Sequence, residues 1–160
     1  ITWIFSYYMS EELWTEKIDE ISALSEDIIV LPFWRGESLL HKKFISLSRY
    51  ALDKKVKMHI STNGHYVDGE KAEVLSQYEF VTFSIHTEEG FKKAVEFARQ
   101  YKSETNTLQI SFVDAEVELQ HYMKEALADA DLMGFDAVRL YNEHSIDGEF
   151  GHSRINNEKE

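Results

Sequence analysis

Polar residues of the kinds that bind ligands stand immediately after several apolar segments of this chain. The first group is Arg35-Gly36-Glu37-Ser38, which ends an apolar run at residues 28–34. A Ser-Thr-Asn-Gly group follows at residues 61–64, a Ser-Ile-His group at 84–86 and a Tyr-Asn-Glu-His group at 141–144. Each group by itself is compatible with an ordinary turn, since Asn-Gly is a common turn dipeptide. Their repetition after apolar segments indicates a site for a polar ligand.

The apolar segments have the length and composition of buried β-strands. Five of them are rich in β-branched and aromatic residues and recur at the spacing of one strand plus one returning helix. They occupy residues 28–34, 56–62, 80–86, 108–113 and 137–141. Strands that alternate with helices predict parallel pairing with right-handed crossovers. An open doubly wound sheet and a part of a β/α barrel both fit, and both bind ligands at the C-terminal ends of the strands.

Amphipathic segments lie between the predicted strands and carry helix-capping signals. Ser10, Asp68 and Thr87 are placed to cap the starts of helices, and Gly134 to end the long helix predicted over residues 117–133. We expect the inward stripes to be Trp14, Ile18, Ile21 and Ser25, then Leu40, Phe44, Leu47 and Ala51, then Ala72 and Leu75, then Phe91, Ala94, Val95 and Ala98, and last Leu119, Met123, Ala126 and Ala130.

Composition narrows the classes of protein to which the chain can belong. The 160 residues are 43% hydrophobic, and the formal net charge of -12 argues against binding to nucleic acid or to an anionic membrane. No apolar run has the length of a bilayer-spanning helix. We predict a cytoplasmic protein with one domain at residues 1–146 and a polar tail at 147–160. The chain contains no cysteine, which excludes disulfides and cysteine metal ligands within these residues.

The order of the polar groups resembles that in the radical S-adenosylmethionine enzymes, especially members with an additional C-terminal iron-sulfur domain. Arg35-Gly36-Glu37-Ser38 stands where that family has Gly-Gly-Glu-Pro after its second strand. Thr62-Asn63-Gly64 matches the family's Thr-Asn-Gly, and Ser84-Ile85-His86 stands in place of Ser-Ile-Asp. The resemblance extends from about residue 8 to residue 141. It implies a partial β/α barrel of parallel strands.

The resemblance also implies a binding site for S-adenosylmethionine on the strand ends. Glu37 and neighbouring carbonyls would accept hydrogen bonds from the ligand's ammonium group, and Gly36 would let the backbone approach it. Ser84 would contact the ribose or the carboxylate, and Asn142 would stand on the same rim. The residues implied in cofactor binding are Arg35, Gly36, Glu37, Ser38, Thr62, Asn63, Ser84, His86 and Asn142. In the competing interpretation, Arg35 and Glu37 pair with each other or with the next helix.

The same family needs a [4Fe-4S] cluster held by three cysteines, and this sequence has none. The family's cysteine loop lies between its first strand and its first helix, which corresponds here to the region before Ser10. We therefore expect a truncated core that lacks the first strand and the cluster loop, in preference to a protein that has lost its cluster. Such a fragment would be inactive alone and would self-associate through its open sheet edge.

Two other functions remain open on the sequence. A metal-dependent hydrolase would use His86, His144 and Glu37 as ligands, although no HxH or HExxH spacing supports it. A non-catalytic ligand-binding or partner-binding domain would use its acidic helices only as solvated faces. In the preferred interpretation the substrate is a small molecule or a peptide, whose identity the sequence does not give.

Overall fold

A computed structural model describes residues 9–32, 36–113 and 117–141 of the chain. These residues form a parallel five-stranded sheet in the order β1-β2-β3-β4-β5. The strands are β1 (Ile29–Val30), β2 (Lys57–Thr62), β3 (Phe80–Ile85), β4 (Thr107–Val113) and β5 (Ala137–Tyr141). The helical elements are α1 (Glu11–Leu24), η1 (Ser38–Leu40), α2 (Phe44–Asp53), α3 (Gly69–Leu75), α4 (Glu88–Tyr101), η2 (Val117–Leu119) and α5 (Gln120–Met133).

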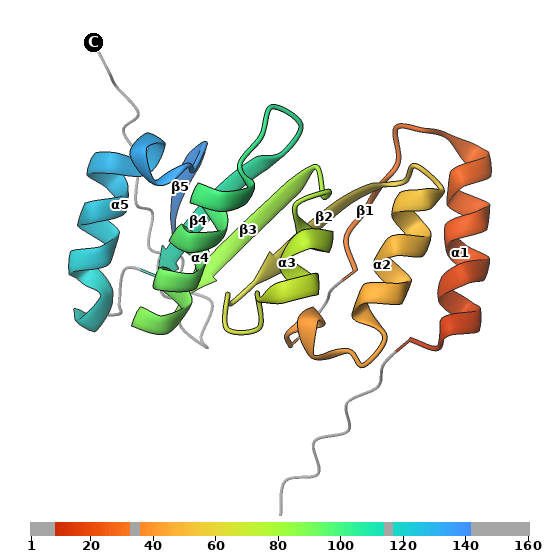
Figure 1. Ribbon diagram of the computed structural model, residues 1–160, viewed down its shortest axis with the longest axis horizontal. Coiled ribbons are helices and arrows are strands. Elements are labelled where there is room, and N and C mark those ends of the chain that lie inside the picture. The colour runs from red at the N-terminus through yellow and green to blue at the C-terminus, as the bar shows by residue number, and fades with distance from the viewer. Residues whose placement is uncertain (1–8, 33–35, 114–116, 142–160) are drawn as a thin grey trace, which may run out of the picture.

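The five α-helices of the described residues lie on one side of the sheet (Figure 1). A doubly wound sheet would carry helices on both sides, so the arrangement is that of a partial β/α barrel. Because all strands are parallel and neighbours in the chain are neighbours in the sheet, their C-terminal ends share one rim. This confirms the predicted fold class, and the strands that precede the first three polar groups (residues 35–38, 61–64 and 84–86) end on that rim. We call these three groups the first, second and third motif.

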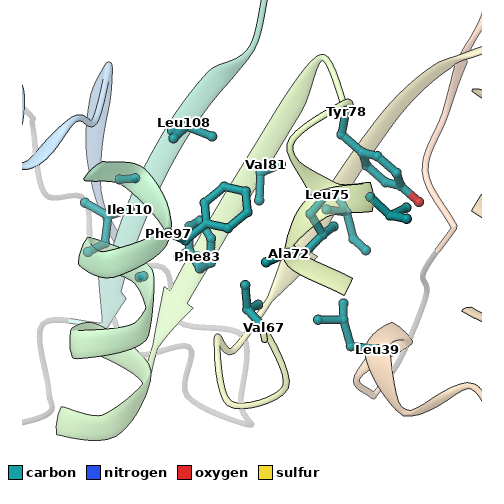
Figure 2. Close-up of a cluster of buried hydrophobic side chains, with 14 of the residues drawn as sticks. Leu39, Val67, Ala72, Leu75, Tyr78, Val81, Phe83, Phe97, Leu108 and Ile110 are labelled. Atoms are coloured by element: carbon teal, nitrogen blue, oxygen red, sulfur yellow. The ribbon is translucent and has the colours of Figure 1, made fainter. Parts of the chain in front are cut away.

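The core fills the space between the sheet and this helix layer (Figure 2). Alternate strand residues point into it, as the period of two requires. Among the most deeply buried are Ile60 on β2, Phe83 on β3 and Ile110 on β4. The intervening residues of the same strands therefore face the opposite side of the sheet.

Local capping chemistry sets the ends of several helices as predicted. Ser10 accepts a hydrogen bond from the backbone N–H of Leu13 at 3.2 Å, and Thr87 accepts one from that of Gly90 at 3.1 Å. Gly134 ends α5 with a φ of 91°, a conformation that favours glycine. Asp68 occupies the N-cap position of α3 without a side-chain capping bond.

The structure corrects four details of the predicted elements. The described part of the first strand is only Ile29–Val30, since Pro32 lacks the N–H that a ladder requires. Leu40 is 47% exposed, because α2 begins at Phe44 and the preceding 3₁₀ turn buries Leu39 instead. Ser25 is an exposed C-cap residue. The helix predicted over 117–133 begins as the separate 3₁₀ turn η2.

None of the helices in the described part of the chain has the length and apolar character needed to cross a membrane. The predicted polar tail at 147–160 lies outside the described residues.

Candidate functional site

Glu37 connects the first two motifs through hydrogen bonds to its carboxylate. Its carboxylate accepts hydrogen bonds from the Thr62 hydroxyl at 3.0 Å, to both oxygens, and from the backbone N–H of Asn63 at 2.8 Å. It also accepts one from the backbone N–H of Leu39 at 3.1 Å, which caps η1. The half-buried carboxylate therefore joins the segment after β1 to the end of β2, two segments that lie far apart in the sequence.

Gly36 and Ser38 set the course of the described backbone that leads into η1. Gly36 has a φ of 85°, in the left-handed region that other residues rarely adopt. Ser38 donates from its hydroxyl to the carbonyl oxygen of Pro32 at 2.9 Å, which joins the start of η1 to the segment that follows β1. The predicted site residues Gly36 and Ser38 thus shape the loop that presents Glu37.

The loop after β2 is held by its own polar atoms and by α4. Asn63 accepts from the backbone N–H of His65 at 3.0 Å, and Thr62, which is 2% exposed, accepts from that of Gly64 at 3.2 Å. A Cβ on Gly64 would lie 2.9 Å from the carbonyl oxygen of Gly90, the first-turn residue of α4. The two backbones therefore touch without any side chain between them, which only glycine permits.

Ser84, the predicted site residue of the third motif, belongs to a row of hydroxyls on the side of the sheet away from the helices. Its Oγ lies 3.0 Å from that of Ser61 on β2 and 3.3 Å from that of Ser111 on β4. Ser111 is 2% exposed and also lies 3.3 Å from the carbonyl oxygen of Phe83. Hydroxyls both donate and accept, so the half-buried Ser61 and Ser84 can adapt to either kind of ligand atom, while the buried Ser111 supports Ser84.

Further polar residues lie on this side of the sheet, inside the strands. The sequence-based prediction of the site did not include them, because it considered only the residues at the strand ends. Gln109 donates to the Thr82 hydroxyl at 3.3 Å, and Arg139 pairs in register with Ser111. The signal for them is the polar-apolar alternation of each strand, which indicates one face away from the core. We use the name open face for the side chains of Ser61, Thr82, Ser84, Gln109, Ser111 and Arg139.

Of the remaining predicted site residues, His86 lies within the described part of the chain. His86 is exposed just beyond β3. Arg35 and Asn142 lie outside the described residues, so pairing of Arg35 with Glu37 is untested. Within the described ranges no group of three or more His, Asp or Glu side chains could hold a metal ion. His144, the third ligand of the hydrolase hypothesis, also falls outside them.

The residues do not fit a four-iron cluster, because thiolates hold such clusters and the whole chain contains no cysteine. They fit S-adenosylmethionine better. That ligand presents an ammonium donor, a carboxylate acceptor and ribose hydroxyls, and the rim offers backbone carbonyls, amides and the serine hydroxyls of β2 and β3.

Solved structures with the same fold come from Streptococcus suis. SuiB bound to S-adenosylmethionine superposes with a TM-score of 0.59 and 14% sequence identity over 84% of this chain. SuiB alone gives 0.59 and 14% over 84%, and SuiB bound to the precursor peptide SuiA gives 0.56 and 14% over 80%. No family model matches the chain, and no curated protein matches it in sequence.

These likenesses show the fold and no more at such low identity. The chain corresponds to about a third of the SuiB chain, with 35%, 34% and 32% of it covered in the three structures.

Proposed function

We propose that this chain is the S-adenosylmethionine-binding core of a radical S-adenosylmethionine enzyme. Two independent lines support the proposal. The order of the polar groups after the strands resembles that family, and the fold resembles that of a protein crystallised with S-adenosylmethionine.

The observation that carries the proposal is the convergence of the three motifs at one rim. Glu37 bonds to Thr62 and Asn63 on the core side of the end of β2, and Ser61, which faces the opposite side of the same strand end, contacts Ser84. A sequence of unrelated turns has no reason to connect its polar side chains from strand to strand, whereas a ligand site needs such groups held in fixed positions.

In this proposal the residues have different roles toward the ligand. Glu37 acts as a positioning residue, since its oxygens already accept from three protein donors, and the carbonyls beside Gly36 accept from the ammonium group. Ser84 hydrogen-bonds the ribose or carboxylate. Arg35, His86 and Asn142 keep their proposed places beside the ligand.

S-adenosylmethionine supplies a carbon-centred radical in the family that the chain resembles, once a cluster has reduced it. The 160 residues contain no thiolate, so cluster ligands have to come from outside them, and we derive no reaction step. The proposed role of this chain is to bind and orient the cofactor. A small molecule or a peptide is the proposed substrate, since SuiB has been crystallised with a precursor peptide.

The direct test is an NMR titration of the ¹⁵N-labelled chain with S-adenosylmethionine. We expect saturable shifts of the Gly36, Asn63 and Ser84 amides, with a dissociation constant at or below about 1 mM. Ser84→Ala should weaken binding roughly threefold to tenfold, the value of one neutral hydrogen bond.

The matched control is Ser46→Ala, which removes an exposed hydroxyl of α2 whose one hydrogen bond within the described residues is to the Lys43 carbonyl at 3.0 Å. It should leave the affinity unchanged. Shifts confined to residues away from the rim, or equal affinities for the two serine variants and the original chain, would refute the proposed site.

A further inference from the structure

Arg139 is an exposed cation on the open face. It forms no ion pair with any residue in the described part of the chain, although the sequence contains 29 acidic residues against 17 basic ones. The exposed Arg99 of α4 likewise has no ion pair within the described residues, so what distinguishes Arg139 is its place on the open face, in register with Ser111. A guanidinium in that place can recognise an anionic ligand.

Two other basic side chains on the same side of the sheet already have carboxylate partners. Lys57 lies 3.0 Å from a carboxylate oxygen of Asp27, and the Nε2 of His59 lies 3.0 Å from one of Glu79. Both pairs stand toward the starts of the strands. Arg139, in contrast, stands in register with Ser111, a member of the hydroxyl row.

Tyr141 orients the guanidinium. The Cζ of Arg139 lies 4.8 Å from the centre of the Tyr141 ring, two residues along β5 and on the same side of the strand. A cation over an aromatic face is attracted through the flat side of the guanidinium. Its N–H edges stay available, and those edges form the fork that binds a carboxylate through two parallel hydrogen bonds.

Strand register places this fork in the same row as the third motif. Ser84 pairs with Ser111, and Ser111 pairs with Arg139. Adjacent strands lie about 4.8 Å apart, so Arg139 is roughly two strand spacings from Ser84. Gln109, one alternation back on β4, adds an amide to the same face.

We propose that Arg139 binds a carboxylate group of a ligand held on the open face. The carboxylate belongs either to the side chain of an acidic substrate, such as a glutamate of a peptide, or to the amino-acid part of S-adenosylmethionine. The inference rests on the proposed function only in treating the open face as the ligand side of the sheet.

The test observes the side-chain Nε–Hε signals of the arginines in the ¹⁵N-labelled full chain at low salt. The Arg139 signal is the one that disappears in Arg139→Lys. One arm adds N-acetylglutamate N-methylamide, with its uncharged glutamine counterpart as the probe control. The other arm adds S-adenosylmethionine. We expect the Arg139 signal to shift saturably with a carboxylate ligand. The dissociation constant of the glutamine compound should be at least about tenfold higher than that of the glutamate compound.

The two arms identify the source of the carboxylate. A response to the glutamate compound supports an acidic substrate, and a response to S-adenosylmethionine alone supports the cofactor; both support the proposal. Arg99→Gln, which changes an exposed arginine of α4, should leave either affinity unchanged, whereas Arg139→Gln should abolish the preference for glutamate.

Equal shifts of Arg139 with the glutamate and glutamine compounds, together with no response to S-adenosylmethionine, would overturn the proposal. The proposed function fails in a different way, by absence of shifts at the Ser84 amide. Binding of the glutamate compound without such shifts would leave the arginine site standing and remove the cofactor site.

Discussion

Replacing Glu37 by glutamine tests whether this side chain holds the rim together. The substitution keeps the shape and removes the charge. It also converts one of the two acceptor oxygens into an NH₂ donor. In the structure one oxygen receives the N–H of Leu39 and the other that of Asn63, while the Thr62 hydroxyl reaches both. Whichever way the amide turns, one backbone N–H must face another donor.

The size of the effect follows from that conflict. A hydrogen bond to a charged group contributes about 1.5–3 kcal/mol to stability, and an amide N–H left without an acceptor carries a similar cost. We therefore expect Glu37→Gln to lower the free energy of unfolding by about 1.5–3 kcal/mol. Glu37→Asp should also be destabilising, because it keeps the charge but shortens the reach from the β1 side to the end of β2.

Urea unfolding followed by circular dichroism measures the change, and hydrogen exchange locates it. The amide that faces the NH₂ group, either Leu39 or Asn63, should exchange faster than in the original chain. Glu96→Gln is the matched control, since Glu96 is exposed on α4 and its side chain forms no hydrogen bond or ion pair within the described residues. Surface changes of this kind stay within about 0.5 kcal/mol. A loss for Glu37→Gln no larger than for Glu96→Gln, with both amides unchanged, would refute the reasoning.

Two further substitutions test packing and a buried hydroxyl. Gly64→Ala should lower the free energy of unfolding by about 1–2 kcal/mol for its left-handed backbone and by another 1–3 kcal/mol for the contact with the Gly90 carbonyl. Gly36→Ala is the control: it has a similar φ but open space around it, so urea unfolding should show only the first of these losses. Equal losses for the two variants would disprove the close approach. Burial raises the pKa of Tyr78, whose hydroxyl lies 2.8 Å from that of the 3% exposed Ser48. The folded state then holds this proton more tightly than the unfolded state, so stability is full below about pH 10 and falls as the pH rises further. Tyr78→Phe should cost about 1–3 kcal/mol at pH 7 but weaken that alkaline fall, and an unchanged slope above pH 10 would contradict the assignment.

What the sequence could predict here is what depends on near neighbours. The caps at Ser10 and Thr87 and the end of α5 at Gly134 involve residues within one turn, so residue type and spacing suffice. The parallel strands followed equally from their regular alternation with helices. Leu40 was wrongly placed in the core, because a single turn shifted the register of the apolar stripe and no local signal marks where η1 gives way to α2.

The candidate site was predictable in its location and less so in its connections. Polar residues after strands located the rim, but the bond from Glu37 to Thr62 joins residues from separate strand-helix units. Only the packed sheet decides that the two meet. Arg139 was overlooked for a related reason: it stands inside a strand, and its exposure depends on which side of the sheet the helices cover.

The contact between Gly64 and Gly90 has a mechanical consequence. Side chains at an interface accommodate small displacements by changing rotamer, but two backbones in direct contact cannot adjust in this way. A shift of the loop that carries Asn63 must therefore move the first turn of α4, and with it the end of β3 where Ser84 stands. The second and third motifs therefore move together as a rigid body, so a ligand that displaces either of them displaces both.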